Sequence, residues 1–280
     1  MLSGKPFSGK GIIITGGGSG LGLQMAKTMG SYGAVIHIIS RDREKLDRAN
    51  NMLKEHGIEC FTYSSDIRDY EKIKEIVQNM MKDHEISGLI NNAAGNFISR
   101  TEDLSMNAFL AVINIVLTGS INITLEVGKN WIKEGKKGSI LSILATYVDS
   151  GSPYVVPSAT AKSGLQAFTR SIATEWAPKG IRANGIAPGP FKTEGAWKNL
   201  IPDDMAENVM ILRNPMRRLG KKEEIGELAA YLMSDAAEFI NGETIRIDGG
   251  EFIQGAAQFS MLSMLPDSMW EQMKERRNKK

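Results

Sequence analysis

The sequence contains little cysteine and almost no net charge. Cys60 is the single cysteine among 280 residues, so a disulfide within the chain is impossible. The 34 lysines and arginines nearly balance the 32 aspartates and glutamates, which leaves a formal net charge of +2. Such a balance gives no indication of a nucleic-acid partner or of an acidic membrane surface. We expect neither of these partners, and no metal site.

The sequence also lacks a recognisable targeting or membrane-spanning segment. Residues 1–10 are polar and glycine-rich, which does not fit a signal peptide. No apolar run looks long enough to span a bilayer, and the final Asn278-Lys279-Lys280 is not a peroxisomal address. We therefore expect a soluble protein, cytoplasmic if the source is bacterial. If the source is eukaryotic we expect the mitochondrial matrix, with a transit peptide preceding this sequence.

Short β-branched runs alternate along the chain with longer amphipathic stretches. The pattern predicts strands at 11–15, 35–40, 60–64, 88–91, 139–143, 182–187 and 244–248, and helices at 20–32, 44–56, 69–83, 106–134, 159–177 and 223–234. Strands that alternate with helices of this length indicate βαβ units and a parallel sheet covered on both faces. We predict one α/β domain over residues 1–280, a Rossmann-like, doubly wound parallel β-sheet flanked by helices.

Two segments lie outside this alternation. Residues 189–222 contain three prolines and read as irregular, and a span that long in a compact domain is often a substrate loop. Residues 251–280 form a C-terminal extension. Its apolar content predicts a tail that docks, across a subunit interface or on the chain itself, through Leu262, Leu265, Met269 and Trp270.

The run TGGGSGLG at 15–22 follows the first strand and opens a helix. Glycines allow positive φ and let backbone N–H groups approach a pyrophosphate, and the helix N-terminus favours the anion. A glycine-rich turn alone is a weak signal, but the order strand, loop, helix is the context that dinucleotide binding requires. We expect cofactor contacts from Gly16, Gly18, Ser19, Gly20, Leu21 and Gly22.

The end of the second strand favours NADPH over NADH. An acidic residue there would bind the ribose 2′-hydroxyl of NAD, whereas this chain has Ser40-Arg41. Arg41 can pair with the 2′-phosphate of NADP through charge-assisted bonds. The alternative is an exposed arginine without a ligand, with Asp42 beside it. Asp66, which follows the third strand, is placed to accept a hydrogen bond from the adenine amino group.

Four motifs occur in a fixed order along the chain. They are TGGGSGLG at 15–22, NNAAG at 91–95, IAPGP at 186–190 and IDGG at 247–250. In order and spacing they resemble the signatures of the short-chain dehydrogenase/reductase family. The resemblance implies further cofactor contacts at Ile67, Asn92, Lys162, Pro188, Gly189 and Phe191.

The usual catalytic group of that family is largely replaced in this chain. Lys162 stands at the lysine position of the Tyr-x-x-x-Lys pair, but Ser158 occupies the tyrosine position. Ala145 stands where a serine is usual, and Val116 where the helix asparagine is usual. One interpretation is a non-catalytic NADP-binding protein. The other is a rebuilt site whose acid lies elsewhere.

Tyr147 favours the rebuilt site. It follows the fifth strand, at the edge where a parallel sheet places its ligand groups, fifteen residues before Lys162. This rearrangement, together with Gly95-Asn96-Phe97, resembles the 2,4-dienoyl-CoA reductases of the mitochondrial and bacterial type. The resemblance implies NADPH-dependent reduction of 2,4-dienoyl-CoA thioesters to 3-enoyl-CoA during β-oxidation of unsaturated fatty acids. The alternatives are a trans-2-enoyl-CoA reductase and the non-catalytic NADP-binding protein.

The displaced tyrosine makes chemical sense for such a substrate. In a dienoyl thioester the expected hydride acceptor is the δ carbon, four bonds from the thioester carbonyl, so negative charge gathers on an oxygen remote from the nicotinamide. We expect Tyr147 and Asn96 to hydrogen-bond that oxygen. Lys162 would hold the nicotinamide ribose, and Ser158 would orient the thioester or a water. Tyr154 is the alternative donor, and Asn96 could serve only as a turn residue.

The resemblance also implies substrate contacts by Arg68, Phe97 and Ser105 besides Tyr147. Without it, Arg68 reads as a solvated side chain, Phe97 as core and Ser105 as a helix N-cap. An arginine that contacts CoA in related enzymes aligns with Asn199, beside Lys198, and lysine lacks the bidentate fork of arginine. The family resemblance further implies a homo-oligomer, most often a tetramer.

Overall fold

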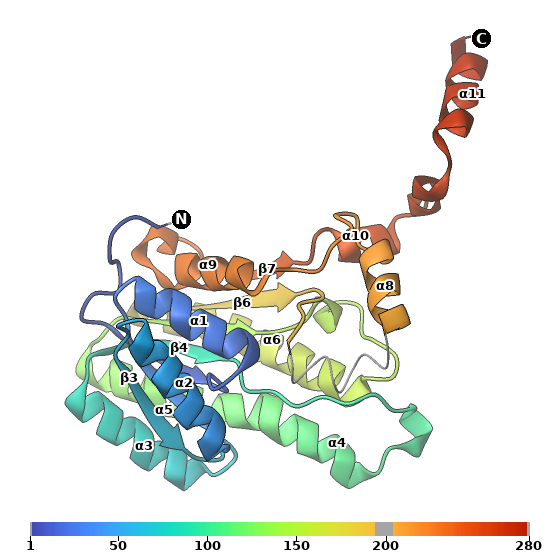
Figure 1. Cartoon of the computed structure of the whole chain (residues 1–280). Helices are drawn as coiled ribbons and strands as arrows, with labels where there is room; N and C mark the ends of the chain where they lie inside the picture. The colour runs from blue at the N-terminus through green and yellow to red at the C-terminus, as the bar shows by residue number, and fades with distance from the viewer. Residues whose placement is uncertain (1, 194–203, 279–280) are drawn as a thin grey trace.

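The computed structural model describes residues 2–193 and 204–278. Within them, seven parallel strands form one sheet in the order β3-β2-β1-β4-β5-β6-β7 (Figure 1). The strands are β1 (Gly11–Thr15), β2 (Val35–Ser40), β3 (Cys60–Ser64), β4 (Ile86–Asn91), β5 (Gly138–Ile143), β6 (Ile181–Pro188) and β7 (Thr244–Ile247). The strand order reverses between β1 and β4, and the crevice at such a switch point is where doubly wound sheets bind ligands.

Helices cover both faces of the sheet. They are α1 (Gly20–Ser31), α2 (Arg43–Glu55), α3 (Tyr70–Asp83), α4 (Met106–Ile113), α5 (Gly119–Glu134), α6 (Val156–Trp176), α8 (Asp204–Arg213), α9 (Lys222–Met233), α10 (Glu251–Ala256) and α11 (Asp267–Asn278). Helices α1, α2 and α9 enclose one apolar cluster, while α3, α5 and α6 enclose the other. The predicted α/β fold with a Rossmann-like parallel sheet flanked by helices is therefore confirmed.

Close backbone approach sets the packing of α5 on the sheet. Trp131 is fully buried and donates its indole N–H to the carbonyl of Ile86, 2.7 Å away. A Cβ at Gly138 would lie 2.5 Å from the Trp131 ring, and one at Gly128 would lie 2.4 Å from the Trp176 ring. Glycine is required at both positions because the two indoles occupy the space of a side chain.

One helical stretch bears on the expectation that no segment spans a membrane. Helices α4 and α5 are joined through a π-helical turn, Asn114–Thr118, into one stretch, Met106–Glu134. By length and composition alone this stretch could cross a membrane. Its apolar residues include Ile123, Val127 and Trp131, which are buried against the sheet. Core helices pass the same test for this reason, so the finding is weak evidence for a membrane span.

The segments outside the alternation differ from expectation. The loop predicted as irregular contains α8 within its described part. The C-terminal extension forms α10, a short 3₁₀ turn (Ser260–Met264) and α11, which projects away from the body (Figure 1). No residue of α11 is buried, and the side chains of Met269 and Trp270 are exposed. Helix α11 therefore does not dock on the described part of its own chain, whereas α10 packs beside β7.

His37 lies fully buried in β2. Its ring stacks on Phe61 and Tyr63 of β3, with Nδ1 3.2 Å from the Tyr63 hydroxyl. Among the described residues, Nε2 has no hydrogen-bond partner. Burial, and to a lesser degree the neighbouring His84, lower the pKa of His37 from 6.5 to about 4. The folded protein therefore holds this imidazole neutral at pH values where the unfolded chain protonates it.

Because His37 is buried in its neutral form, we expect the free energy of unfolding to decrease at acid pH. The stabilisation is complete above pH 6.5 and is lost as the pH falls toward 4, by up to about 3 kcal/mol. Urea unfolding across this range measures the free energy of unfolding at each pH. We expect His37→Phe to flatten the slope and His56→Gln, at an exposed position after α2, to leave it unchanged. Equal slopes in the wild type and His37→Phe would contradict the prediction.

Candidate active site

A cavity of about 1100 Å³ opens at the carboxyl edge of the sheet. The loops that follow β1, β2, β3, β4, β5 and β6 all contribute to its wall. Among the predicted site residues, its lining contains Gly16, Ser19, Gly20, Leu21, Arg41, Asp66, Ile67, Asn92, Asn96, Tyr147, Ser158, Lys162, Pro188, Gly189 and Phe191. The fold thus brings together residues that are spread from the first strand to the sixth.

The glycine-rich loop has the shape that a pyrophosphate requires. Gly16 and Gly20 have positive φ, +66° and +57°. A Cβ at Gly22 would lie 2.5 Å from Asn92 Nδ2 and 2.6 Å from the carbonyl of Gly16. The backbone is therefore packed too closely for any side chain there, and Ser19 precedes the N-terminus of α1. These features fit a nicotinamide dinucleotide on the loop. Gly18 and Gly22 shape the loop without lining the cavity.

Asn92 and Thr15 hold this loop in place. Asn92 Nδ2 donates to the carbonyls of Thr15 and Gly16, at 3.0 and 3.2 Å. Thr15 Oγ1 accepts from the backbone N–H groups of Asn92 and Ala93, both at 3.0 Å. The loops after β1 and β4 are thereby joined across the switch point. Asn92, predicted as a cofactor contact, thus also positions the phosphate-binding loop.

Two arginines surround Asp66 at the adenosine end. Arg68 donates through Nε and Nη2 to the carboxylate, at 3.0 and 2.6 Å, and Arg41 Nη1 lies 3.6 Å from it. Hydrogen bonds from Arg68 hold the pKa of Asp66 near 2, so its carboxylate is ionised and accepts hydrogen bonds. Arg41 lines the cavity with a side chain that is 58% exposed and thus accessible to a phosphate.

Tyr147 and Ser158 meet at the other end of the cavity. Tyr147 lies in a 3₁₀ turn, η3 (Thr146–Val148), directly after β5, and Ser158 lies in the first turn of α6. Their hydroxyl oxygens are 2.9 Å apart. Burial raises the pKa of Tyr147, which the bond to Ser158 partly offsets. The phenol is therefore protonated near neutral pH and can donate a hydrogen bond or a proton.

Lys162 lies one turn beyond Ser158 on α6. It is buried, and its ammonium group donates to the carbonyl of Ile143 at the end of β5. Burial lowers its pKa to about 8. The amine is therefore mostly protonated at neutral pH and supplies a positive charge to the cavity wall.

The positions that carry other catalytic groups in the family are apolar here. Ala145 lines the cavity beside Tyr147 without a polar atom in its side chain. Val116 is fully buried in a cluster with Val112 and Ala161. Neither side chain can donate a proton, so Thr146 and Tyr147 of η3 and Ser158 and Lys162 of α6 are the polar groups that these two elements offer at this end of the cavity.

Several predicted substrate contacts do not line the cavity. Phe97 packs against the cluster of Val112 and Val116. Ser105 caps α4, accepting from the backbone N–H of Ala108 at 3.2 Å. Tyr154, the alternative donor, is 58% exposed and has φ +66°. For Phe97 and Ser105 the local packing matches the structural alternative, as core and as helix cap.

The other substrate predictions have mixed outcomes. Arg68 does not line the cavity and is paired with Asp66. Asn96 lines the cavity, and its Oδ1 accepts from the backbone N–H of Phe97 at 2.9 Å, which leaves the Nδ2 end as a donor. Asn199 and Lys198 lie outside the described residues.

Other residues of the wall were not predicted. The structure adds Lys45, Ser152, Thr193, Met210 and Glu251. Glu251 begins α10, and burial raises the pKa of its carboxyl group. Lys45 follows Arg41 by four residues at the start of α2, which a helical projection could have placed on the same face. No signal in the sequence places Met210 or Glu251, because they reach the cavity only through the packing of α8 and α10.

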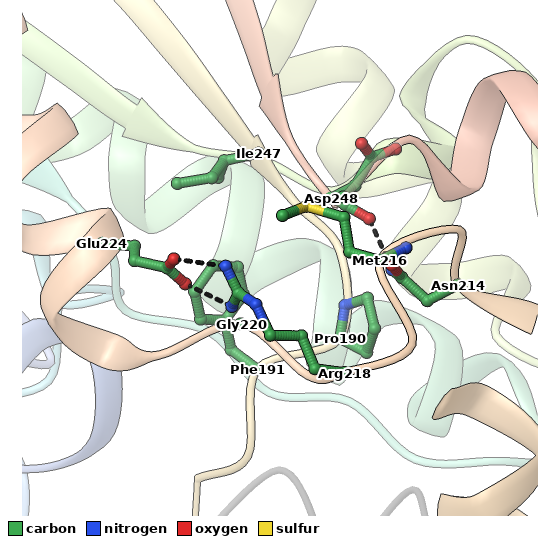
Figure 2. A pocket seen from close by; sticks show the side chains of 10 residues that line it. Pro190, Phe191, Asn214, Met216, Arg218, Gly220, Glu224, Ile247 and Asp248 are labelled. Atoms are coloured by element: carbon green, nitrogen blue, oxygen red, sulfur yellow. Dashed lines mark hydrogen bonds and ion pairs between the residues drawn. The ribbon is translucent and has the colours of Figure 1, made fainter. Parts of the chain in front are cut away.

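A second, smaller cavity of about 210 Å³ lies beside the loop after β6 (Figure 2). Pro190 and Phe191 line both cavities. Arg218 forms a bidentate pair with Glu224, at 2.9 and 2.6 Å, along one wall. The two side chains satisfy each other, so this wall offers no free charge to a ligand.

The same region joins the two ends of the loop that was predicted at residues 189–222. The backbone N–H of Gly220 donates to the carbonyl of Pro190 at 3.0 Å. Asn214 Nδ2 donates to the carbonyl of Asp248 at 2.7 Å (Figure 2). The loop thus leaves and rejoins the body beside β7, which keeps its described ends next to the large cavity.

Comparisons with known proteins agree with this geometry. The family model described as enoyl-(acyl carrier protein) reductase matches residues 16–251. A Caenorhabditis elegans protein named as a probable 2,4-dienoyl-CoA reductase, (3E)-enoyl-CoA-producing, is 40% identical over 273 residues, which are 95% of this chain and 88% of that protein. A Bacillus subtilis protein named as a probable 2,4-dienoyl-CoA reductase, (2E)-enoyl-CoA-producing, is 38% identical and covers 87% of this chain and 97% of its own.

Solved structures show the same architecture. The crystal structure of a short chain dehydrogenase from Bacillus anthracis has a TM-score of 0.78 at 40% identity, covering 86% of this chain and 96% of its own. A gluconate 5-dehydrogenase from Burkholderia cenocepacia, solved with NADP and tartrate, has a TM-score of 0.83 at 27% identity, covering 90% and 98%.

Proposed function

Because this chain belongs to the short-chain dehydrogenase/reductase family, we propose that it is an NADPH-dependent 2,4-dienoyl-CoA reductase that forms 3-enoyl-CoA. Relatives at 34–40% identity bear the name of this activity, in nematodes, Bacillus subtilis and Arabidopsis thaliana. The nematode relatives are named for the (3E) product and the Bacillus relative for the (2E) product. The chain is an oxidoreductase that acts on carbon–carbon double bonds.

This proposal rests on the paired hydroxyl groups of Tyr147 and Ser158. Tyr147 is a protonated donor inside the cavity, and Ser158, at the position of the usual tyrosine, is its hydrogen-bond partner at 2.9 Å. A ketone reductase needs its acid beside the carbon that accepts hydride. A dienoyl thioester needs a donor at the thioester oxygen instead, and the carbon that bears this oxygen is four bonds from the hydride acceptor. A tyrosine moved from α6 to η3 meets that requirement.

When NADPH is bound, it would supply the hydride for the δ carbon of the diene. Tyr147 donates to the thioester oxygen as it gains negative charge, with Ser158 holding the phenol in place. The Nδ2 group of Asn96 is the second donor to this oxygen, and each such donor contributes roughly 3 kcal/mol to the barrier reduction. Proton delivery at the α carbon, from Tyr147 or a water that it orients, then leaves the double bond between the β and γ carbons.

Lys162 acts on the cofactor side. Its ammonium group donates to the carbonyl of Ile143, which ends β5, the strand that Tyr147 follows. In this position it binds the ribose hydroxyls of the nicotinamide nucleoside. Its charge also favours negative charge on groups nearby, which lowers the cost of forming an anion in the cavity.

The choice of NADPH rests on Arg41. We expect Arg41→Ala to weaken the binding of 2′,5′-ADP by about 30-fold, because it removes charge-assisted bonds to the 2′-phosphate. Binding of 5′-AMP should not change. Isothermal titration gives both dissociation constants. Arg43→Ala is the control, since Arg43 pairs with Asp47 on α2 and does not line the cavity. Equal weakening of both nucleotides would contradict a role in 2′-phosphate recognition.

The function is tested by following NADPH oxidation with 2,4-hexadienoyl-CoA and with crotonyl-CoA. Rapid turnover of the diene alone is expected. Turnover of crotonyl-CoA would instead indicate a 2-enoyl-CoA reductase. Turnover of neither, with NADPH binding intact, would favour a binding protein. Separation of the 2-enoyl and 3-enoyl products decides at which carbon the proton is delivered, and we expect 3-enoyl-CoA.

We also propose that the chain forms a homo-oligomer, a tetramer in the simplest case. Exposed apolar side chains support this, at Met106 and Leu110 on α4 and at Phe259 and Trp270 in the extension, with exposed fractions of 70%, 43%, 69% and 43%. Met106 and Leu110 lie one turn apart on the same helix, and adjacent exposed apolar side chains are typical of contact surfaces. Sedimentation equilibrium measures the mass, and a monomer at micromolar concentration would contradict the proposal.

A further inference from the structure

The turn that carries Tyr147 is short and is held by its own backbone. The N–H of Val148 donates to the carbonyl of Ala145 at 3.2 Å, and the N–H of Gly151 donates to that of Tyr147 at 2.8 Å. From α6, Ser163 Oγ donates to the carbonyl of Val148 at 2.9 Å. These bonds hold the turn, and Val148 packs in an apolar cluster with Leu165 and Ala187. The hydrogen-bond geometry within a 3₁₀ turn is nevertheless poorer than in an α-helix.

A side-chain network holds the same turn from β7. Asp149 follows Val148 directly and forms an ion pair with Arg246 of β7. Gln166 of α6 is buried and donates to Asp149 Oδ1 at 3.3 Å, and also to Thr244 Oγ1 at 3.4 Å. Asp149 is therefore held by two elements that are distant from it in the sequence.

The network continues into the C-terminal extension. The guanidinium group of Arg246 lies over the ring of Phe252, 4.2 Å from its centre. Phe252 lies in the first turn of α10, next to Glu251 of the cavity wall. The cation–π contact limits where the guanidinium can lie. We call Asp149, Gln166, Arg246 and Phe252 the Asp149 clamp.

We propose that Arg246 and Asp149 are positioning residues for Tyr147. Through them, β7 and the start of the C-terminal extension determine where the catalytic hydroxyl group lies. This inference rests on the proposed function of Tyr147. A hydrogen bond to a developing oxyanion weakens steeply when its donor is displaced, and a misplacement of about 1 Å can lower a rate by as much as 100-fold. The clamp restrains the residue two positions after Tyr147 and thereby the turn itself.

The clamp differs from an ordinary surface pair in what its loss should change. The side chains of Arg246 and Asp149 are 37% and 32% exposed. Pairs so accessible to water add little to global stability. Removal of the clamp is therefore expected to leave the melting temperature nearly unchanged while the chemical step slows.

The kinetic test uses Arg246→Met and Asp149→Asn with 2,4-hexadienoyl-CoA. We expect kcat to fall ~10-fold in each, with KM for NADPH unchanged, and Arg246→Lys to recover most of the rate. In a Tyr147→Phe background, Arg246→Met should cost nothing further, because the group that it positions is gone. Lys10→Met, which breaks the ion pair with Asp235, is the matched control and should keep the wild-type kcat. A tenfold loss that persists without the Tyr147 hydroxyl would overturn the proposal.

A second measurement needs no turnover. Hydrogen exchange of the backbone in residues 145–151 should be faster in Arg246→Met than in the wild type, and unchanged in Lys10→Met. Unchanged exchange in Arg246→Met would overturn the clamp whatever the substrate is. Faster exchange in a protein that does not reduce dienoyl-CoA would support the clamp and reject only the proposed reaction.

Discussion

Replacing Tyr147 with phenylalanine is expected to lower kcat for a 2,4-dienoyl-CoA substrate by about 1000-fold. The variant loses the hydroxyl that donates to the thioester oxygen but keeps the ring, so the packing of η3 should persist. The dissociation constant for NADPH should stay within about twofold, because Tyr147 lies at the opposite end of the cavity from Arg41. Steady-state kinetics with 2,4-hexadienoyl-CoA and a separate cofactor titration measure the two effects.

Two further variants separate the hydroxyl of Tyr147 from others nearby. Ser158→Ala removes its partner at 2.9 Å, and we expect a smaller loss of kcat, about 10-fold. Tyr154→Phe removes a hydroxyl from an exposed side chain that does not line the cavity, and its kcat should equal that of the wild type. Full activity of Tyr147→Phe, or a large loss in Tyr154→Phe, would mean that the donor has been assigned wrongly.

The second large effect is expected at Gly22. In Gly22→Ala the new methyl group would lie 2.6 Å from the carbonyl of Gly16 and 2.5 Å from Asn92 Nδ2. The phosphate-binding loop must move to admit it. We expect the dissociation constant for NADPH to rise by about 100-fold, and the free energy of unfolding to fall by about 1–3 kcal/mol. Fluorescence titration and urea unfolding measure the two changes.

Gly255→Ala provides the control for this substitution. Gly255 lies in α10, where a Cβ would meet no atom within 4 Å, and its φ is not positive. Alanine there should leave cofactor binding unchanged and raise helix stability by up to about 1 kcal/mol. An NADPH affinity in Gly22→Ala equal to that of the wild type would show that the loop tolerates a side chain, contrary to the packing described here.

Much of the fold follows from the sequence alone. Seven apolar, β-branched runs appear as the seven strands, and β1, β2 and β3 begin and end where the pattern predicts. The short segment Ile86–Asn91 begins two residues earlier than expected because Ile86 is buried and pairs with Gly11. Local periodicity predicts these elements because the side chains that a strand or helix buries recur at a fixed spacing along its own residues.

The nucleotide end of the site could likewise be predicted from local sequence. The glycines after β1, Arg41 after β2 and Asp66 after β3 each follow a strand in a parallel sheet, and the carboxyl ends of such strands share one edge. Their positions along the chain were therefore enough to place them in one cavity. The same reasoning put Tyr147 there, since it follows β5, whereas Lys162 was placed by its match to the lysine position of the family motif.

Only the tertiary structure decided which side chains touch. The bond between Tyr147 and Ser158 joins η3 to α6 and depends on side-chain directions that no motif states. The ion pair of Asp149 with Arg246 joins residues 97 positions apart. Such contacts form when separate elements pack against each other. The sequence by itself thus determined the elements, the edge of the sheet and the residue types at the site, whereas packing over long sequence separations decided their partners.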